Sequence, residues 1–111
     1  LTGDEILKTV AQLVQARLRK TDTLARWGGE EFMVLLPDTG ENGARNLAEA
    51  IRREVGAHEF PCPDRVTVSL GVATMQAGES LKALTGRVDD ALYRAKVAGR
   101  NRTALAEPDS H

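Results

Sequence analysis

Apolar residues recur every three or four positions in three stretches of the chain, which is the spacing of amphipathic helices. The first stretch runs from Asp4 to about Arg19, with acidic residues in its first turn and basic residues in its last, an order that suits the helix dipole. The second covers residues 43–55. The third begins after Ser80, a predicted cap, and runs towards Gly99, a predicted stop. The pattern therefore predicts three helices.

Shorter apolar runs between these helices predict strands. Residues 24–27 and 31–36 flank a Gly28-Gly29 pair, and they are expected to form a hairpin because glycine reaches the positive φ of tight turns. Alternating apolar residues over 66–72 are typical of a half-buried strand. Gly71 weakens that strand, which suggests that something packs closely against its backbone. Residues 103–105 are a candidate for a last short strand.

This order of elements indicates an α/β or α+β fold in which helices cover a sheet. One hairpin, one good strand and one marginal strand are few for three helices, so a central strand is expected to be missing from this chain. The chain also begins with Leu1 and enters a helical pattern within a few residues. We therefore expect an N-terminally incomplete piece of a longer polypeptide.

Length and composition limit the functions that this chain can have. With 111 residues, 41% of them hydrophobic, the chain is expected to be one domain over residues 1–111, ending in a polar tail at 107–111. Its 15 basic and 16 acidic residues disfavour a protein that binds DNA or RNA. No apolar run approaches the ~20 residues of a membrane span. This segment is therefore expected to be cytoplasmic without membrane contact, even if a longer polypeptide is anchored through another domain. The single Cys62 excludes an internal disulfide.

The stretch from Trp27 to Phe32, Trp-Gly-Gly-Glu-Glu-Phe, has the sharpest chemical signal. A glycine hairpin lets a bulky ligand approach the backbone, and Glu30 and Glu31 place two carboxylates beside it. Mg²⁺ is usually held by one or two carboxylates together with substrate oxygens and water. On spacing alone, a surface hairpin that uses glycines for geometry and glutamates for solubility is the more common case. The alternative is a site for Mg²⁺ and a nucleotide phosphate.

The same stretch, with Arg26 before it, resembles the signature hairpin of the GGDEF family of diguanylate cyclases, in which the position of Glu30 is Asp or Glu. Further stretches resemble that family at the right relative positions, so the resemblance extends over nearly all of the chain. They are Gly3-Asp4, residues 19–22 (Arg-Lys-Thr-Asp), residues 68–72, residues 90–96 and residues 99–101.

The resemblance implies a nucleotidyl-cyclase-like sheet flanked by helices, with the active site on the Gly-Gly hairpin. It also implies that two GTP molecules condense into cyclic di-GMP with release of two pyrophosphates, on Mg²⁺ or Mn²⁺. Two such domains would face each other as a homodimer. In the family, the segment before Gly3 has a strand with a second, aspartate metal ligand, and only Leu1 and Thr2 precede Gly3 here.

Residue roles follow from the same resemblance. Glu30 would bind the metal and help to deprotonate the 3′-hydroxyl, and Glu31 would support that site. Gly28 and Gly29 would leave room for the nucleotide. The remaining contacts are assigned to Asp4 for guanine, to Lys96 and Arg100 for the terminal phosphates, and to Arg19 and Asp22 for an inhibitory cyclic di-GMP site.

Each of these assignments has a simpler alternative. Lys96 and Arg100 lie near a helix end, where cations stabilise the dipole without a ligand, and Asp4 does the same at a helix start. Arg19 and Asp22 could form only a surface ion pair. For the whole chain, the alternatives to a cyclase are an inactive module that binds GTP or cyclic di-GMP as a sensor, and a structural hairpin domain without a nucleotide. The intact hairpin and the intact Arg-Lys-Thr-Asp motif favour the enzyme.

Overall fold

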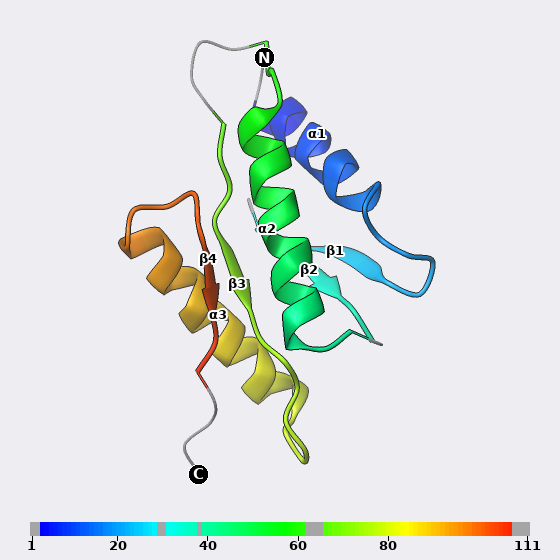
Figure 1. Cartoon of the computed structure of the whole chain (residues 1–111), viewed down its shortest axis with the longest axis vertical. Coiled ribbons are helices and arrows are strands. Elements are labelled where there is room, and N and C mark those ends of the chain that lie inside the picture. Colours follow the sequence, from blue (N-terminus) through cyan, green and yellow to red (C-terminus); the bar gives the residue numbers. More distant parts are fainter. Residues whose placement is uncertain (1–2, 29–30, 38, 62–65, 108–111) are drawn as a thin grey trace.

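The computed structural model describes residues 3–28, 31–37, 39–61 and 66–107, and for residues 26–28 and 31 it describes the backbone alone. Within these residues, three helices and four strands follow one another along the chain (Figure 1). In order they are α1 (Gly3–Gln15), β1 (Thr23–Gly28), β2 (Glu31–Leu35), α2 (Glu41–Ala57), β3 (Leu70–Val72), α3 (Leu81–Val97) and β4 (Thr103–Leu105). The predicted three helices, the hairpin and the short last strand are confirmed.

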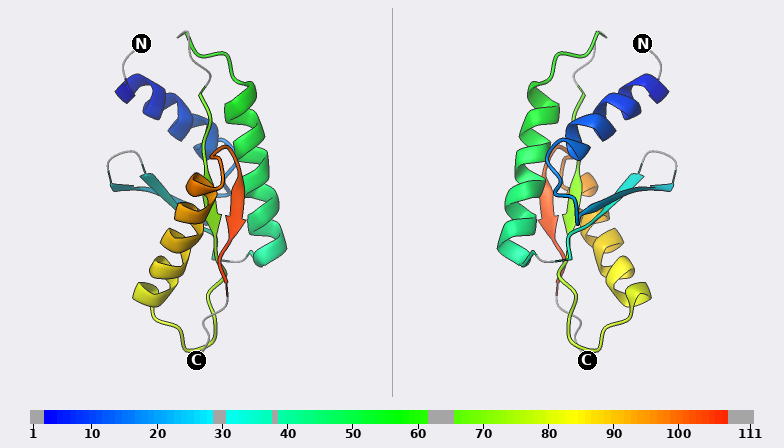
Figure 2. Two further views of the ribbon diagram at one scale, coloured as in Figure 1. Left: turned by 90° about the vertical axis from the view of Figure 1, so that its left-hand side faces the viewer. Right: turned by 90° about the vertical axis from the view of Figure 1, so that its right-hand side faces the viewer.

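In the described part of the chain the strands form two separate two-stranded sheets. β1 and β2 pair as an antiparallel hairpin, whereas β3 and β4 pair in parallel and are connected through α3. The β3–β4 ribbon lies between α2 on one side and α3 on the other, and α1 packs against α2 (Figure 2). The molecule is therefore built in layers, with α2 in contact with both α1 and the parallel ribbon.

The core forms where α1 and α2 pack together. Val10 and Val14 of α1 meet Ile51 and Val55 of α2, and Val55 is fully buried. Partly buried residues of the hairpin, β3 and the connecting segments surround them, namely Leu24, Val34, Phe60, Val66, Val68 and Leu70. The apolar stripes that predicted these two helices are the faces that form the core. α2 extends two residues beyond the predicted range 43–55 at each end.

A closer contact joins β3 to α3. The buried side chains of α3 are those of Ala91 and Ala95. A Cβ built on Gly71 would lie 2.6 Å from the backbone nitrogen of Leu92 and 2.6 Å from the carbonyl oxygen of Val88. Because Gly71, Ala91 and Ala95 are small, the backbone of α3 packs directly against β3. The close approach predicted from Gly71 is confirmed.

Both ends of α3 agree with the prediction. The hydroxyl of Ser80 accepts a hydrogen bond from a backbone N–H in the first turn, at 3.1 Å. At the other end, the N–H of Gly99 bonds to the carbonyl of Lys96, and the N–H of Arg100 bonds to that of Ala95. Gly99 has a φ of 130°, so the helix ends in a Schellman motif with glycine at the left-handed position.

The first helix is shorter than predicted. α1 ends at Gln15 rather than near Arg19, and no basic residue lies in its last turn. The N–H groups of Arg17 and Leu18 bond three residues back, which tightens the chain and turns it out of the helix. Arg17 then forms an ion pair with Glu54 of α2, 2.5 Å between Nη2 and Oε2. Arg17 thus contacts a helix that is far away in the sequence, in place of a further turn of α1.

The strand predicted over residues 66–72 is wrong in its first half. Only Leu70–Val72 pairs, because β4 is three residues long and Leu70 lies opposite Thr103 at its start. Val66 and Val68 still pack against the core. The alternating pattern therefore predicted burial correctly but not strand pairing.

Candidate active site

The hairpin of β1 and β2 positions the predicted glutamates. Gly28, the last residue of β1, pairs with Glu31, the first residue of β2, after a register irregularity that begins at Arg26. The prediction that Gly28 lies between the strands is wrong, because pairing continues through it. Gly29 and Glu30 lie outside the described residues. Irregular pairing next to a hairpin tip is a common way of directing side chains at a site.

Three elements with candidate residues reach the same face of the molecule (Figure 2). The hairpin extends from beside α2 to the face on which α3 and the N-terminal end of α1 lie. Asp4 is exposed in the first turn of α1. The fold thus brings the first turn of α1, the strands of the hairpin and α3 to one side, although they are far apart in the sequence.

The predicted phosphate contacts lie at the end of α3. Lys96 is half-buried and lines a shallow depression together with Asp89, Leu92 and Tyr93. Arg100 closes the Schellman motif, is exposed, and has a left-handed backbone with a φ of 61°. Two cations at a helix C-terminus suit the helix dipole, and they equally suit an anionic ligand.

Arg19 and Asp22 form an ion pair, with 3.5 Å between Nε and Oδ2, but it is not the surface pair of the simpler alternative. The Asp22 side chain is 3% exposed, whereas that of Arg19 is 58% exposed. Asp22 Oδ2 accepts the backbone N–H of Arg19 at 2.9 Å, and Oδ1 is buried without a hydrogen-bond partner among the described residues. Arg19 Nη2 also donates to the Thr39 hydroxyl at 2.6 Å. The motif is a preformed turn with its arginine on the surface.

An ion pair that the sequence analysis missed holds the start of α3. Nε of Arg87 lies 2.7 Å from Oε2 of Glu79, and these side chains are 13% and 3% exposed. Arg87 also donates to the carbonyls of Thr74 and Glu107, at 2.6 and 3.1 Å. Hydrogen bonds from Arg87, and then from the backbone N–H of Gln76, lower the pKa of Glu79 to about 2. Eight residues and the start of a helix separate Glu79 from Arg87, and no helical spacing rule predicts an ion pair across such an interval.

The donor set for a metal ion is of the right kind. Glu30 and Glu31 are adjacent carboxylates, the ligand type that Mg²⁺ prefers, and Mg²⁺ commonly takes its other ligands from substrate and water. Among the residues that the structure describes, no group of three or more His, Cys, Asp or Glu side chains could hold a metal ion.

Comparison with known proteins decides the family. The family model described as "Diguanylate cyclase, GGDEF domain" matches residues 1–102. The chain belongs to the GGDEF family. One curated GGDEF relative, diguanylate cyclase DgcM of Escherichia coli K12, is 49% identical over 104 residues, which cover 94% of this chain and 25% of DgcM. Another, diguanylate cyclase DgcP of Pseudomonas aeruginosa, is 43% identical over 109 residues, which cover 96% and 16%. The chain spans a quarter or less of these relatives.

Solved GGDEF structures have the same fold. The active GGEEF domain of a diguanylate cyclase from Vibrio cholerae is 33% identical, with a TM-score of 0.87. The GGDEF domain of DgcB from Caulobacter crescentus, solved in complex with cyclic di-GMP, is also 33% identical, with a TM-score of 0.90. These matches cover 96% of this chain and 70% and 66% of those chains. The expected fold class and the resemblance noted from the hairpin are confirmed. None of the helices in the described residues is long and apolar enough to cross a membrane.

Proposed function

We propose that this GGDEF domain, within its full-length protein, is a diguanylate cyclase that condenses two GTP molecules into cyclic di-GMP and two pyrophosphates. The observation that supports this most directly is the intact Gly28-Gly29-Glu30-Glu31-Phe32 motif on a β-hairpin. The same five residue types name the active GGEEF domain from Vibrio cholerae, which has the same fold. Half-buried Lys96 of α3 and exposed Arg100 just beyond that helix add a place for phosphates.

The chemistry divides among the chain's own residues. The 3′-oxygen of one GTP attacks the α-phosphorus of another, the bond to the bridging oxygen of the β-phosphate breaks, and pyrophosphate leaves. Glu30 accepts the hydroxyl proton, and Glu31 supports its position. Mg²⁺ or Mn²⁺, when bound by Glu30, supplies positive charge to the phosphates. Lys96 and Arg100 neutralise the terminal phosphates.

The remaining contacts orient the substrate. Asp4 accepts hydrogen bonds from the guanine base, and Gly28 and Gly29 leave room for the nucleotide beside the hairpin. Each domain holds one GTP, so closure of the product ring requires a second copy that faces the first, and the enzyme acts as a homodimer. Alignment of the two substrates supplies most of the rate enhancement. The reaction is placed in the cytoplasm, where GTP is available.

Product feedback is part of the same proposal. Arg19 is exposed and can stack on guanine or bind phosphate with its guanidinium fork, while Asp22 holds the turn below it. Cyclic di-GMP, which offers both guanine edges and phosphates, fits this pair as an inhibitor.

Glu30→Gln in the full-length protein tests the function. The change removes a charge at nearly constant volume, so the fold should survive while formation of cyclic di-GMP from GTP falls far below a tenth of the wild-type rate. Glu59→Gln is the matched control, because Glu59 is exposed in the loop after α2. Activity above about a tenth in Glu30→Gln would contradict the assignment. A wild-type protein that binds GTP or cyclic di-GMP without turnover would instead be the sensor module.

A further inference from the structure

The turn that presents Arg100 is conformationally strained. Arg100 and Asn101 both have left-handed backbones, with φ of 61° and 46°, and neither is glycine. Asn tolerates this region because of its short polar side chain, but Arg adopts it rarely. Two successive residues of this kind persist only where the surroundings hold them. The contacts of Asn101 therefore determine the direction in which the Arg100 side chain leaves the backbone.

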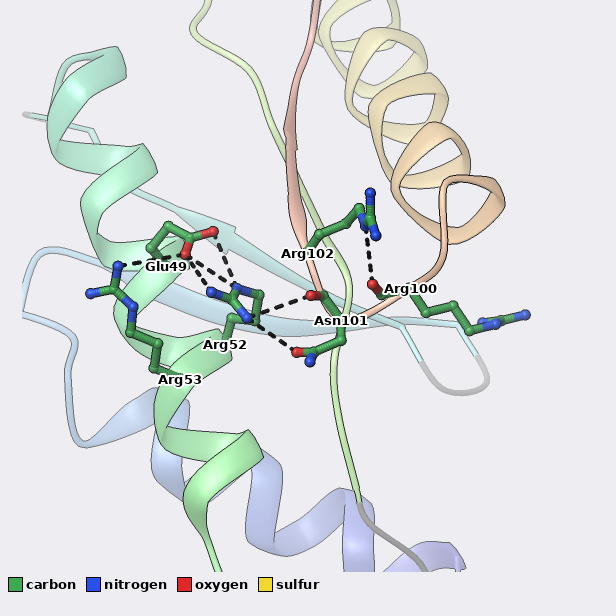
Figure 3. A network of polar contacts seen from close by, with 6 residues as sticks. All are labelled: Glu49, Arg52, Arg53, Arg100, Asn101 and Arg102. Atoms are coloured by element: carbon green, nitrogen blue, oxygen red, sulfur yellow. Dashed lines mark hydrogen bonds and ion pairs between the residues drawn. The ribbon is translucent and has the colours of Figure 1, made fainter.

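Arg52 of α2 holds this turn from the side. Its Nη1 lies 3.3 Å from Oδ1 and 3.5 Å from the backbone oxygen of Asn101 (Figure 3). The other edge of the same guanidinium bonds Glu49, with 2.8 Å between Nη2 and Oε2. The backbone N–H of Asn101 donates to the Ser69 hydroxyl at 3.1 Å. α2, the segment before β3 and the end of α3 thus meet at one asparagine.

The Glu49–Arg52 pair is built as a rigid support. The two side chains are 29% and 23% exposed, so the pair is shielded from much of the solvent. Hydrogen bonds from Arg52 keep the pKa of Glu49 below its usual range, so the carboxylate is charged at neutral pH. In Figure 3 the side chain of Arg100 points away from this pair. Arg52 therefore cannot share a ligand with Arg100 at this geometry, and its effect would pass through the turn.

We infer that Arg52 is a positioning residue for substrate phosphates: by binding Asn101 it fixes the left-handed turn that aims Arg100. The inference rests on the proposed function, in which Arg100 contacts the terminal phosphates of GTP. Without Arg52 the turn can relax to ordinary backbone angles. The Cα–Cβ bond of Arg100 then points in another direction, and the guanidinium moves with it. Loss of Arg52 should therefore weaken binding of the β- and γ-phosphates and leave binding of the guanosine unchanged.

The test compares variants of the full-length protein. Arg52→Ala removes the support, and Arg100→Ala removes the cation. Arg53→Ala is the matched control, because Arg53 is 75% exposed on the same helix and, among the described residues, pairs with Glu49 alone, at 4.0 Å. Binding of guanosine 5′-(α,β-methylene)triphosphate, which cannot react, and of GMP is measured by calorimetry, and KM and kcat are measured with GTP. Thermal unfolding of each variant is recorded alongside.

Arg52→Ala is expected to weaken binding of the triphosphate analogue about tenfold and to raise KM for GTP similarly, below the ~100-fold that a 1 Å misplacement can cost. GMP binding should not change, and Arg53→Ala should match the wild type. Arg52→Ala should add little in an Arg100→Ala background, because the two act as one unit. If Arg52→Ala does not fold, Arg52→Lys replaces it, since lysine keeps the positive charge beside Glu49 but lacks the planar guanidinium that bonds Glu49 and Asn101 together.

Three results overturn the inference. They are unchanged analogue affinity in Arg52→Ala, an equal loss for GMP and the analogue, and full additivity with Arg100→Ala. The proposed function fails separately, when the wild-type protein forms no cyclic di-GMP from GTP. In that case the binding measurements still decide whether Arg52 acts through Arg100.

Discussion

Gly71→Ala should destabilise the domain by about 1 to 3 kcal/mol, the usual cost of adding a carbon to a filled contact. The new Cβ would lie 2.6 Å from the Leu92 nitrogen, 2.6 Å from the Val88 oxygen and 3.1 Å from the Leu92 Cα. Ordinary contact begins near 3.4 Å. These are backbone atoms of α3, so no side chain can rotate away, and the helix would have to move by about 1 Å.

The assay is thermal unfolding of wild type and variants, with urea titration as a second probe. For a domain of this size, 1 kcal/mol corresponds to about 4 °C or more in Tm. Gly86→Ala is the matched control: Gly86 is exposed within the same helix, and nothing lies within 4 Å of its added Cβ. That change should stabilise by about 0.5 to 1 kcal/mol, because alanine favours helix. A Gly71→Ala protein as stable as wild type would refute the backbone contact.

Three further predictions concern the other sites. In the full-length protein, Arg19→Ala should relieve inhibition by cyclic di-GMP without lowering turnover; equal cyclic di-GMP affinity in both proteins by calorimetry would contradict a product site. Glu79→Gln should lower the urea midpoint at pH 7. Because the folded pKa of Glu79 is about 2, below its ordinary 4.5, that difference should persist above pH 4.5 and shrink as the pH falls towards 2; a constant difference across this range would argue against the ion pair with Arg87. The 111-residue chain alone should associate or exchange strands and show no cyclase turnover, since its two small sheets leave edges for pairing; light scattering that finds a stable monomer, together with wild-type turnover, would disprove this.

Local chemistry explains which features could be predicted from the sequence. The hairpin, the Ser80 cap, the Gly99 stop and the close contact at Gly71 each depend on one or two residues with a restricted backbone or a single capping group. Hydrophobic periodicity predicted the faces of α1 and α2 for a similar reason, because burial follows the spacing along one helix.

The missed features depend on partners that lie far away in the sequence. α1 ends at Gln15, and Arg17 beyond it pairs with Glu54 of α2; the strand before Leu70 is cut short because its partner, β4, has only three residues. The Glu49–Arg52 pair looks like an ordinary surface pair at helical spacing, and its contact with Asn101 exists only in the folded chain. For the candidate site, residue types were predictable, while the support behind Arg100 was not.

The two sheets should differ in how easily they open. The parallel ribbon is covered by α2 and α3, whereas the hairpin is a two-stranded sheet, a unit that is marginal by itself in water. Amide hydrogen exchange should therefore be fastest in β1 and β2 and slowest in β3 and α3. Glu31, proposed to support the metal site, would then lie on the element with the lowest local stability, and Lys96, a proposed phosphate contact, on one of the most stable. Substrate that binds both would slow exchange in the hairpin first.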